Sequence, residues 1–396
     1  MKLTLRQQIT QFTHILQSQL FPVLEEQIGV LDAPAKRLVA TLEMIPLARF
    51  VPSSRGWMGR PSKDRYAIAC AFVAKAVYGF TETRQLLERL TQDAQLRQIC
   101  GWKAGQPLPH ESTFSRAFDE FARMELPQFV HEALIRETQG DRLIGHIARD
   151  STAIEAREHF PETEQAQPAK AEAPAAAKQN KKGPRGPQKR WKGGKRRAAL
   201  NPDTRLHRQR TMGLQEMLAE LPRECSIGAK TNSQGQKEFW RGYKLHLDVA
   251  DGQIPISAVL TGAKVHDSQV AIPLATMTTQ RVTYCYELMD AAYDAQEIRE
   301  HTQAMGHVAI VDPAARGRKS KSVTIPLGKP PRQLSWAEAD RYRERTMIER
   351  VNARLKDEFG GRFIRVRGAA KVMAHLMFGL LALTVDQLLR LGVKDP

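Results

Sequence analysis

Residues Tyr342–Glu349 read YRERTMIE, and the same polar pattern continues to Lys356. At about 100° per residue, a helix over this segment places four polar side chains in a stripe about 60° wide. The stripe consists of Tyr342, Arg345, Glu349 and Lys356. Apolar residues such as Met347 and Ile348 fall on the opposite side, where a core would hold them. One carboxylate therefore stands among cationic and phenolic groups, which suits a residue that holds a metal ion beside a nucleic-acid backbone.

The charge of the chain points to a polyanionic partner. Its 396 residues carry a formal net charge of +17, and basic proteins of this kind commonly bind nucleic acid. Between Lys178 and Arg210 there are thirteen Lys and Arg residues and one acid, Asp203. This segment is either a solubilising linker or a non-specific clamp on the phosphate backbone, which would make binding salt-sensitive. The basic residues expected to contact DNA there are Lys189, Arg190, Arg196 and Arg197.

Cysteine usage and hydropathy favour a soluble protein of the cytoplasm. The four cysteines are far apart and form no CxxC pair, so neither a zinc site nor a disulfide framework is expected. The N-terminus lacks the apolar core of a signal peptide. The longest apolar run, Leu376–Val385, is too short to span a bilayer, and no membrane partner is expected.

Residues 1–135 are predicted to form a helical N-terminal domain. Leucines recur at helical spacing through Thr81–Ile99, and Ser112 or Thr113 is expected to begin another helix. The turn Gly105–Pro109 between them is compatible with a helix-turn-helix reader, in which Arg116 would face DNA. On these residues alone, a helical packing module is an equally good interpretation.

From residue 142 the pattern changes from helical to alternating. Strands are predicted at 143–150, 239–249, 254–260, 283–290 and 307–311. The first and the fourth end in an acid, Asp150 and Asp290. Helices are expected after the third and the fourth strands, with Asp267 and Asp294 as their N-caps.

Two further segments complete the organisation. Residues 156–230 are rich in Ala, Pro, Gln and Lys, with few apolar residues in the first half, and are predicted to be a largely disordered insertion. Residues Gly368–Leu391 are predicted to be an amphipathic helix that caps the core. Hairpin-connected strands, then strands alternating with helices, are typical of an RNase H-like domain. We therefore expect an α/β fold, in which a mixed sheet flanked by helices (136–396) follows the all-helical domain.

Three acids are candidates for a metal site: Asp150, Asp290 and Glu349. Phosphodiester chemistry is commonly performed with two divalent ions about 4 Å apart, and hard ions such as Mg²⁺ prefer oxygen ligands. The acids come from two strands and a helix, as such a site requires. Asp150 could instead be a turn residue, and Asp290 could be a helix cap. Other acids also lie near element ends, namely Asp248, Asp267 and Asp312.

The spacing of the polar stripe resembles the Y-R-E-K motif of bacterial insertion-sequence DDE transposases, in the group that contains insertion-sequence families four and five. Asp150-Ser151-Thr152 is similar to the first-acid motif of these enzymes, and Asp290–Asp294 is similar to the second. Residues 240–246 and 265–268 look like their strand-pair region. The resemblance covers residues 140–390 and, more loosely, 55–120.

The resemblance implies a transposase in which the three acids coordinate two Mg²⁺ ions, with Mn²⁺ as a substitute. The enzyme would cleave at the ends of the element and join the freed 3′-hydroxyl to target DNA. Arg345 and Lys356 would bind phosphates, and Tyr342 would position the backbone. A homodimer on double-stranded DNA, associated with the bacterial nucleoid, is also implied. The alternatives are a metal-dependent nuclease that cuts without joining and a DNA-binding regulator derived from a transposase.

Overall fold

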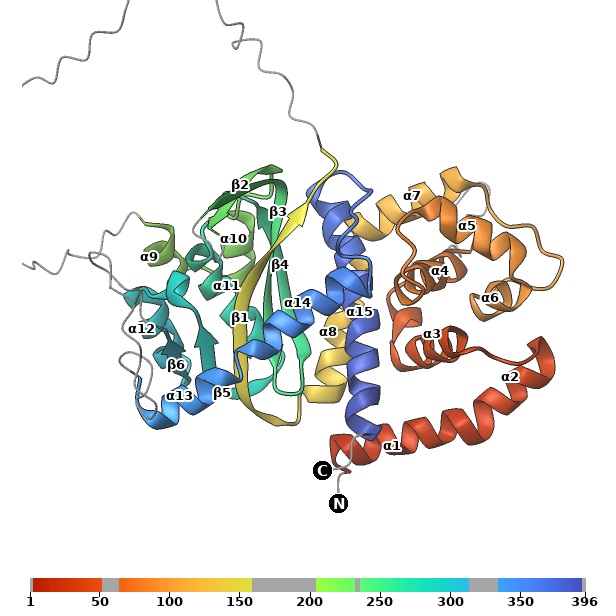
Figure 1. Ribbon diagram of the computed structural model, residues 1–396, viewed down its shortest axis with the longest axis horizontal. Helices are drawn as coiled ribbons and strands as arrows, with labels where there is room; N and C mark the ends of the chain where they lie inside the picture. Colours follow the sequence, from red (N-terminus) through yellow and green to blue (C-terminus); the bar gives the residue numbers. More distant parts are fainter. Residues whose placement is uncertain (1–2, 52–63, 159–203, 232–235, 313–333, 394–396) are drawn as a thin grey trace, which may run out of the picture.

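A computed structural model describes residues 3–51, 64–158, 204–231, 236–312 and 334–393 (Figure 1). Helices fill the N-terminal part, and a mixed sheet flanked by helices fills the rest. The basic residues Lys189, Arg190, Arg196 and Arg197 lie outside the described residues.

The N-terminal part is helical, as predicted. Its helices are α1 (Leu5–Ile15), the π-helical η1 (Leu16–Leu20), α2 (Phe21–Ile28), α3 (Ala33–Met44), the 3₁₀ turn η2 (Leu47–Arg49), α4 (Arg65–Val77), α5 (Thr83–Gln92), α6 (Ala94–Ile99), α7 (Glu111–Arg123) and α8 (Leu126–Gln139). The single helix predicted over Thr81–Ile99 is divided between α5 and α6. Asp93 ends α5, and its carboxylate accepts a 2.9 Å bond from the Leu96 N–H and so begins α6.

The helix-turn-helix interpretation is not supported. Residues 100–110 connect α6 to α7, and this connection is much longer than the three- or four-residue turn of that motif. His110, rather than Ser112 or Thr113, precedes the first turn of α7, and its Nδ1 accepts from the Ser112 N–H. The opposite face of α7 packs into the core, where Phe114 and Phe121 are fully buried. The helical packing module fits these helices better.

The second part contains all five predicted strands and one more. The strands are β1 (Leu143–Glu155), β2 (Ser226–Thr231), β3 (Lys237–Ala250), β4 (Ile254–Gly262), β5 (Thr283–Met289) and β6 (Val308–Val311). The helices are α9 (Arg205–Gln209), α10 (Leu214–Ala219), α11 (Ser268–Thr279), the 3₁₀ turn η3 (Ala291–Tyr293), α12 (Gln296–Ala304), α13 (Trp336–Arg343), α14 (Thr346–Asp357) and α15 (Ala369–Val393).

The sheet has the mixed pairing of an RNase H-like domain. β3 is antiparallel to β1, β2 and β4, whereas β1, β5 and β6 are parallel to one another in that order. Asp248 of β3 bonds Thr278 of α11, and the next residue back, Leu247, belongs to the core shared with α14 and α15. Because successive strand residues face opposite sides, these helices cover opposite faces of the sheet.

Two predicted boundaries are wrong. β1 does not end at Asp150 but continues to Glu155, because it pairs with β3 as far as Gly242. The insertion predicted over 156–230 is ordered from residue 204. Its apolar residues Leu206, Leu214 and Met217 pack into a cluster with residues of α11 and β5.

The helix predicted through Tyr342–Lys356 is interrupted. α13 ends at Arg343 and α14 begins at Thr346. At the interruption the Arg345 N–H bonds the Tyr342 carbonyl, and the Ile348 N–H bonds the Arg345 carbonyl. These are bonds to the third residue back, so the chain tightens locally into a 3₁₀-like turn. Tyr342 and Glu349 therefore lie on different helices.

Of the two predicted helix caps, one is right in position only and the other is wrong. Asp267 occupies the N-cap position of α11, but its carboxylate bonds no N–H group of that helix. Ala295, not Asp294, precedes α12. Asp290 itself accepts a bond from the Ala292 N–H and begins η3.

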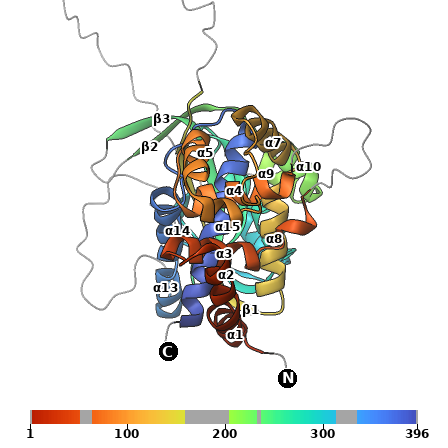
Figure 2. The same ribbon diagram turned by 90° about the vertical axis from the view of Figure 1, so that its right-hand side faces the viewer.

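The C-terminal helix is central rather than peripheral. α15 packs on α1, α3, α4, α7 and α8 as well as on β4 and α14 (Figures 1 and 2). Phe378 of α15 meets Phe72 and Phe118 at ring distances of 5.9 and 6.3 Å. By length and composition α15 could cross a membrane, but 83% of its most apolar window is buried inside the protein. The two predicted domains thus share one continuous core.

Candidate active site

The strand register brings two of the predicted acids together. β1 and β5 are parallel, and Arg149 pairs with Met289. Asp150 and Asp290 directly follow this pair of residues, so the two aspartates lie side by side. Glu349 comes from the first turn of α14, which packs on β1. The three acids predicted from the sequence therefore come from β1, the end of β5 and α14.

Arg345 links two of these acids. Its guanidinium lies 3.4 Å from Asp150 Oδ2 and 2.8 Å from Glu349 Oε1. It also stands over the Tyr342 ring at 5.8 Å from the ring centre. The side chain of Arg345 is mostly buried, whereas that of Glu349 is 57% exposed. A cation at this position offsets part of the repulsion between the carboxylates.

Burial disfavours the charged form of both aspartates. Burial raises the pKa of Asp150 to about 6, and the neighbouring charge of Asp290 adds to this rise. Burial likewise raises the pKa of Asp290, with the charge of Asp267 as a further cause. The Ser151 and Ala292 N–H groups oppose these effects by donating to the two carboxylates at 2.7 and 2.9 Å. Perturbed, mutually repelling carboxylates are typical of functional sites.

These side chains fit a hard cation by type. Carboxylate oxygens are the ligands that divalent ions such as Mg²⁺ prefer, and a cation would relieve the cost of two desolvated, adjacent anions. In the part of the chain that the structure describes, no three His, Cys, Asp or Glu side chains are close enough to hold one ion. Asp150 Oδ2 instead faces Arg345, so binding at all three acids requires side-chain movement.

The other predicted DNA contacts are spread around the site. Tyr342 is half-buried. Burial raises the pKa of its hydroxyl, the charge of Arg345 opposes this rise, and the charges of Asp312 and Asp290 add to it. Lys356 lies at the far end of α14, where burial and the charges of Lys230 and Arg362 lower its pKa. Lys356 is seven residues, about two helical turns, beyond Glu349.

Arg116 is exposed on α7, among the N-terminal helices. No contact joins it to the acids within the described residues. The structure brings together Asp150, Asp290, Glu349, Arg345 and Tyr342, and leaves Arg116 apart.

A buried ion network beneath the site was missed by sequence reasoning. Arg149, next to Asp150, is fully buried and donates two 2.8 Å bonds to Asp248 and one of 2.9 Å to Glu287. Tyr284 and Thr302 donate to Glu287. Asp248, considered above as an alternative metal ligand, is thus structural. Charged residues inside otherwise apolar strands were the signal that could have identified this network.

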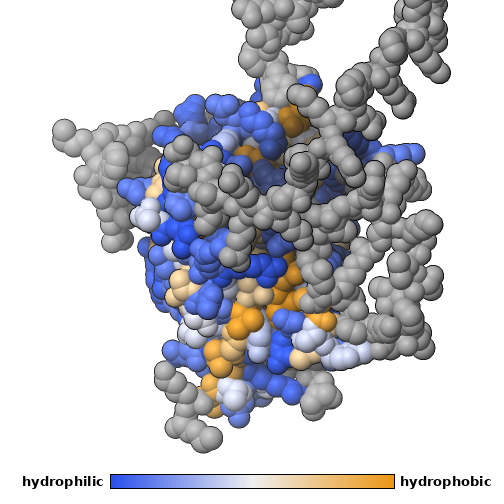
Figure 3. Space-filling model, turned by 90° about the vertical axis from the view of Figure 1, so that its left-hand side faces the viewer, coloured by the Kyte–Doolittle hydropathy of each residue, from blue (hydrophilic) through white to orange (hydrophobic). Residues whose placement is uncertain are grey.

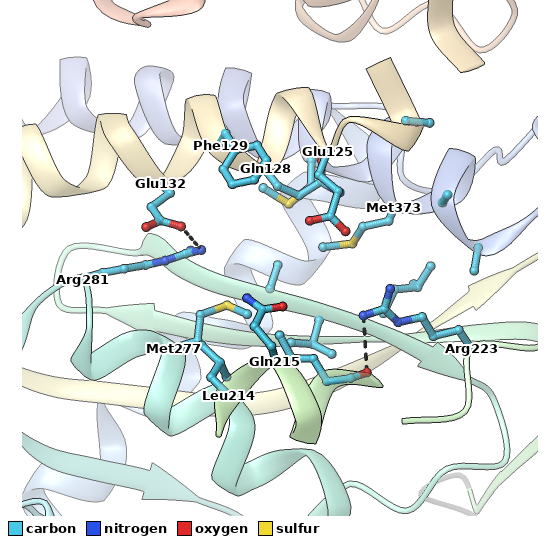
Figure 4. Close-up of a pocket in the computed structure, with 18 of the residues that line it drawn as sticks. Glu125, Gln128, Phe129, Glu132, Leu214, Gln215, Arg223, Met277, Arg281 and Met373 are labelled. Atoms are coloured by element: carbon cyan, nitrogen blue, oxygen red, sulfur yellow. Dashed lines mark hydrogen bonds and ion pairs between the residues drawn. The ribbon is translucent and has the colours of Figure 1, made fainter. Parts of the chain in front are cut away.

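One cavity, of about 430 Å³, lies between α8, α10, β4, α11 and α15, and Asp150, Asp290 and Glu349 do not line it (Figure 4). The face of the molecule at the α12–α13 end is mostly hydrophilic, with hydrophobic residues gathered in one lower area (Figure 3). Val308 and Leu143, at the starts of β6 and β1, are large exposed apolar residues of this sheet.

A mixed sheet of this order, flanked by helices and preceded by a helical region, is consistent with an RNase H-like domain of the DDE class. A family model described as "Transposase DDE domain" matches residues 216–385, and one described as "Transposase domain (DUF772)" matches residues 22–120. The chain belongs to the insertion-sequence DDE transposases. No curated protein and no solved structure is a significant match to it.

Membership of this family carries the general reaction. DDE transposases act on DNA by phosphodiester cleavage and strand transfer, generally with divalent metal ions. Asp290 and Glu349 fall inside the range that the DDE domain model matches. Asp150 falls between the two matched ranges and belongs to neither. The narrower assignment by the Y-R-E-K motif remains a prediction.

Proposed function

We propose that Asp150, Asp290 and Glu349 are the metal ligands of the transposition site and that they hold two Mg²⁺ ions, for which Mn²⁺ substitutes. The observation that carries this proposal is the register of β1 and β5, which sets Asp150 beside Asp290, together with the Arg345 bridge from Asp150 to Glu349. When bound, two such ions activate an attacking oxygen and stabilise a leaving oxygen.

The proposed reaction has two steps. Water attacks the phosphodiester at the end of the element; a new P–O bond forms, and the bond to the element's 3′ oxygen breaks, leaving a 3′-hydroxyl. That hydroxyl then attacks a target phosphodiester, and the target's own 3′ oxygen leaves as a hydroxyl. The three acids would bring both reactions into one site because Asp150 lies beside Asp290 and is joined to Glu349 through Arg345.

The remaining residues would hold the DNA. Arg345 can release the carboxylates and bind a phosphate with its planar fork, while Lys356 acts as a point charge further along α14. Tyr342 would position the backbone by hydrogen bonding or stacking. Arg116 and the basic residues Lys189, Arg190, Arg196 and Arg197 would add non-specific phosphate contacts. A homodimer in the synaptic complex and a location at the nucleoid in the bacterial cytoplasm belong to the same proposal.

A joining assay tests the proposal. Purified protein, Mg²⁺ and a labelled duplex with the pre-cleaved end of the element are mixed with supercoiled plasmid. Covalent end-to-plasmid products that are absent with Glu349→Ala are expected. Plasmid nicking without joining would instead favour a nuclease, and binding without chemistry in either Mg²⁺ or Mn²⁺ would favour a DNA-binding regulator.

A further inference from the structure

β2 and the first residues of β3 form a two-stranded ribbon that projects from the body on the side of α13 and α14 (Figure 2). Residues 237–241 pair with β2 and, in the part of the chain that the structure describes, with no other strand. The Trp240 ring closes one face of the ribbon, because it leaves no room for a side chain at Gly228. On the other face Phe239 and Ile227 are diagonal neighbours and are 68% and 55% exposed. Two large apolar side chains exposed together favour a binding surface.

This open face of the ribbon lies on the same side of the sheet as Asp150. Asp150 pairs with Leu247 of β3 and faces Arg345, which directly precedes α14. Phe239 stands eight residues before Leu247 in the same strand, so its side chain points to that side as well. At about 3.4 Å per residue, Phe239 lies about 27 Å along β3 from the level of Asp150.

Residues 358–368, which join α14 to α15 and are here called the connector, are basic and exposed. Ile364 is buried and fixes the connector to the core. Arg365 lies 3.5 Å from Glu82, whereas Arg367 makes no ion pair with another described residue. The exposed residues of the connector include three arginines and a phenylalanine, namely Arg362, Phe363, Arg365 and Arg367.

Hydrogen bonds hold the connector between α14 and the ribbon. At its start, Arg362 Nε donates a 3.0 Å bond to Asp357, the last residue of α14. At its end, the Gly368 N–H donates to Glu158 Oε1 at 2.7 Å, and the same oxygen accepts a 2.6 Å bond from the Tyr243 hydroxyl of β3. The connector therefore extends from the end of α14 to the point where the ribbon joins the sheet.

Charge indicates which kind of partner fits this surface. Lys237 and Arg241 are exposed on either side of Phe239 along the same face of the ribbon, and the connector adds its three arginines. The centres of protein–protein interfaces are depleted of charged residues. DNA-binding surfaces are strongly positive, and apolar or aromatic side chains on them wedge between bases or stack on them. The family acts on DNA, so DNA is the partner that this surface fits.

We propose that the open face of the ribbon and the connector bind the DNA on one side of the cleavage point. The connector arginines bind phosphates, and Phe239 contacts a base. Since B-DNA rises 3.4 Å per base pair, the 27 Å along β3 correspond to a contact about eight base pairs from the scissile phosphate. This inference rests on the proposed function, because it takes the three acids as the place of cleavage.

The first test uses the full-length protein and a labelled duplex that spans the junction between the element's end and its flanking DNA, without divalent metal. Gel-shift titration and hydroxyl-radical footprinting measure binding. Phe239→Ala should weaken binding about tenfold, as loss of a stacked aromatic ring does, and should remove protection about eight base pairs from the junction. Phe239→Tyr keeps the ring and should bind as the wild type does.

The control is Phe129→Ala, which removes a ring on α8 that is 49% exposed and should leave the footprint unchanged. Wild-type affinity and footprint in Phe239→Ala would overturn the proposal. A lower Tm together with weak binding in both Phe239→Ala and Phe239→Tyr would show a structural role and would overturn it too. Light scattering of the free protein checks the rival occupant. If Phe239→Ala splits a dimer but binds DNA normally, the surface belongs to a second copy of the chain.

The second test replaces the three connector arginines together by Gln. The slope of log binding constant against log salt concentration should decrease by about 2 to 3, since each lost phosphate contact contributes about 0.9. Arg390→Gln is the control, because Arg390 lies near the other end of α15 and pairs with Asp386 at 2.8 Å. An unchanged slope in the triple variant would contradict the role of the connector.

Both tests are independent of the chemistry at the acids. If the wild-type protein gives the predicted footprint but joins no DNA when Mg²⁺ is added, only the proposed function fails. If the wild type joins DNA and Phe239→Ala binds it equally well, only the ribbon contact fails.

Discussion

The Arg149 guanidinium and the Asp248 carboxylate meet in the interior of the sheet through two parallel 2.8 Å hydrogen bonds, and neither side chain is exposed to solvent. Arg149 immediately precedes Asp150, and Glu287, its second partner, lies three residues before Asp290. The same network therefore joins the two strands that carry the aspartates. Its bonds fix the alignment of β1, β3 and β5 directly beneath the site.

Replacing Arg149 by Met should destabilise the protein by about 3–5 kcal/mol, because Asp248 and Glu287 would remain buried without their cation. Urea unfolding followed by circular dichroism measures this loss. Arg123→Met is the control; Arg123 forms an exposed pair with Asp119, and such pairs contribute about 0–1 kcal/mol. Equal unfolding midpoints for the two variants would show that the network does not stabilise the sheet.

Asp290→Ala should abolish both cleavage and joining while leaving binding to the element's end nearly intact. In the proposed site this carboxylate is a metal ligand. Burial raises its pKa, so burying the charged form costs stability, and its removal should not destabilise the fold. Gel-shift titration and the joining assay on the same preparation measure the two properties. Joining by this variant would rule out the proposed ligand set.

Acid should unfold the protein in part through its buried histidines. Burial lowers the pKa of His131 to about 3 and that of His246 to about 4, from an ordinary 6.5. Below pH 6.5 these histidines are protonated in the unfolded chain but stay neutral in the folded chain, so the free energy of unfolding falls as the pH drops towards 4. Each histidine should contribute a slope of about 1.4 kcal/mol per pH unit. Denaturant unfolding at several pH values measures this slope, and His131→Gln should flatten it.

Phe378→Ala should cost about 3–5 kcal/mol and lower the stability of the helical part and the sheet together. Phe378 stands on α15 against Phe72 and Phe118, within a core that reaches β3 and β4. A single calorimetric transition, shifted to lower temperature, is expected. Two separate transitions, of which only one moves, would show that the parts fold independently.

The strands and their acids could be predicted because local patterns determine them. Alternating residues and turn signals identified five strands, and the acids of two strands and a helix matched a required chemistry. The end of β1 could not be predicted in this way, because its pairing with β3 extends five residues beyond Asp150. The interruption between Tyr342 and Glu349 was hidden for a similar reason, since both segments have helical periodicity.

Long-range partners account for what the sequence did not reveal. The structural role of Asp248 could not be predicted, because its partner Arg149 lies almost 100 positions earlier in the chain. The apolar spacing of α15 indicated a helix, yet it did not indicate that most of this helix would be buried inside the protein. Asp267 had the position of a helix cap, but Lys244 on β3 holds its carboxylate elsewhere.

The central position of α15 has a consequence for protein synthesis. α3, α4, α7 and α8 leave the ribosome early but pack on a helix that is translated more than 200 residues after them. Near the end of α15, Gly392 reaches α1, where its carbonyl accepts from Thr10. A nascent chain therefore exposes the apolar surfaces of its early helices until α15 has emerged, and chaperones that shield such surfaces should govern its yield.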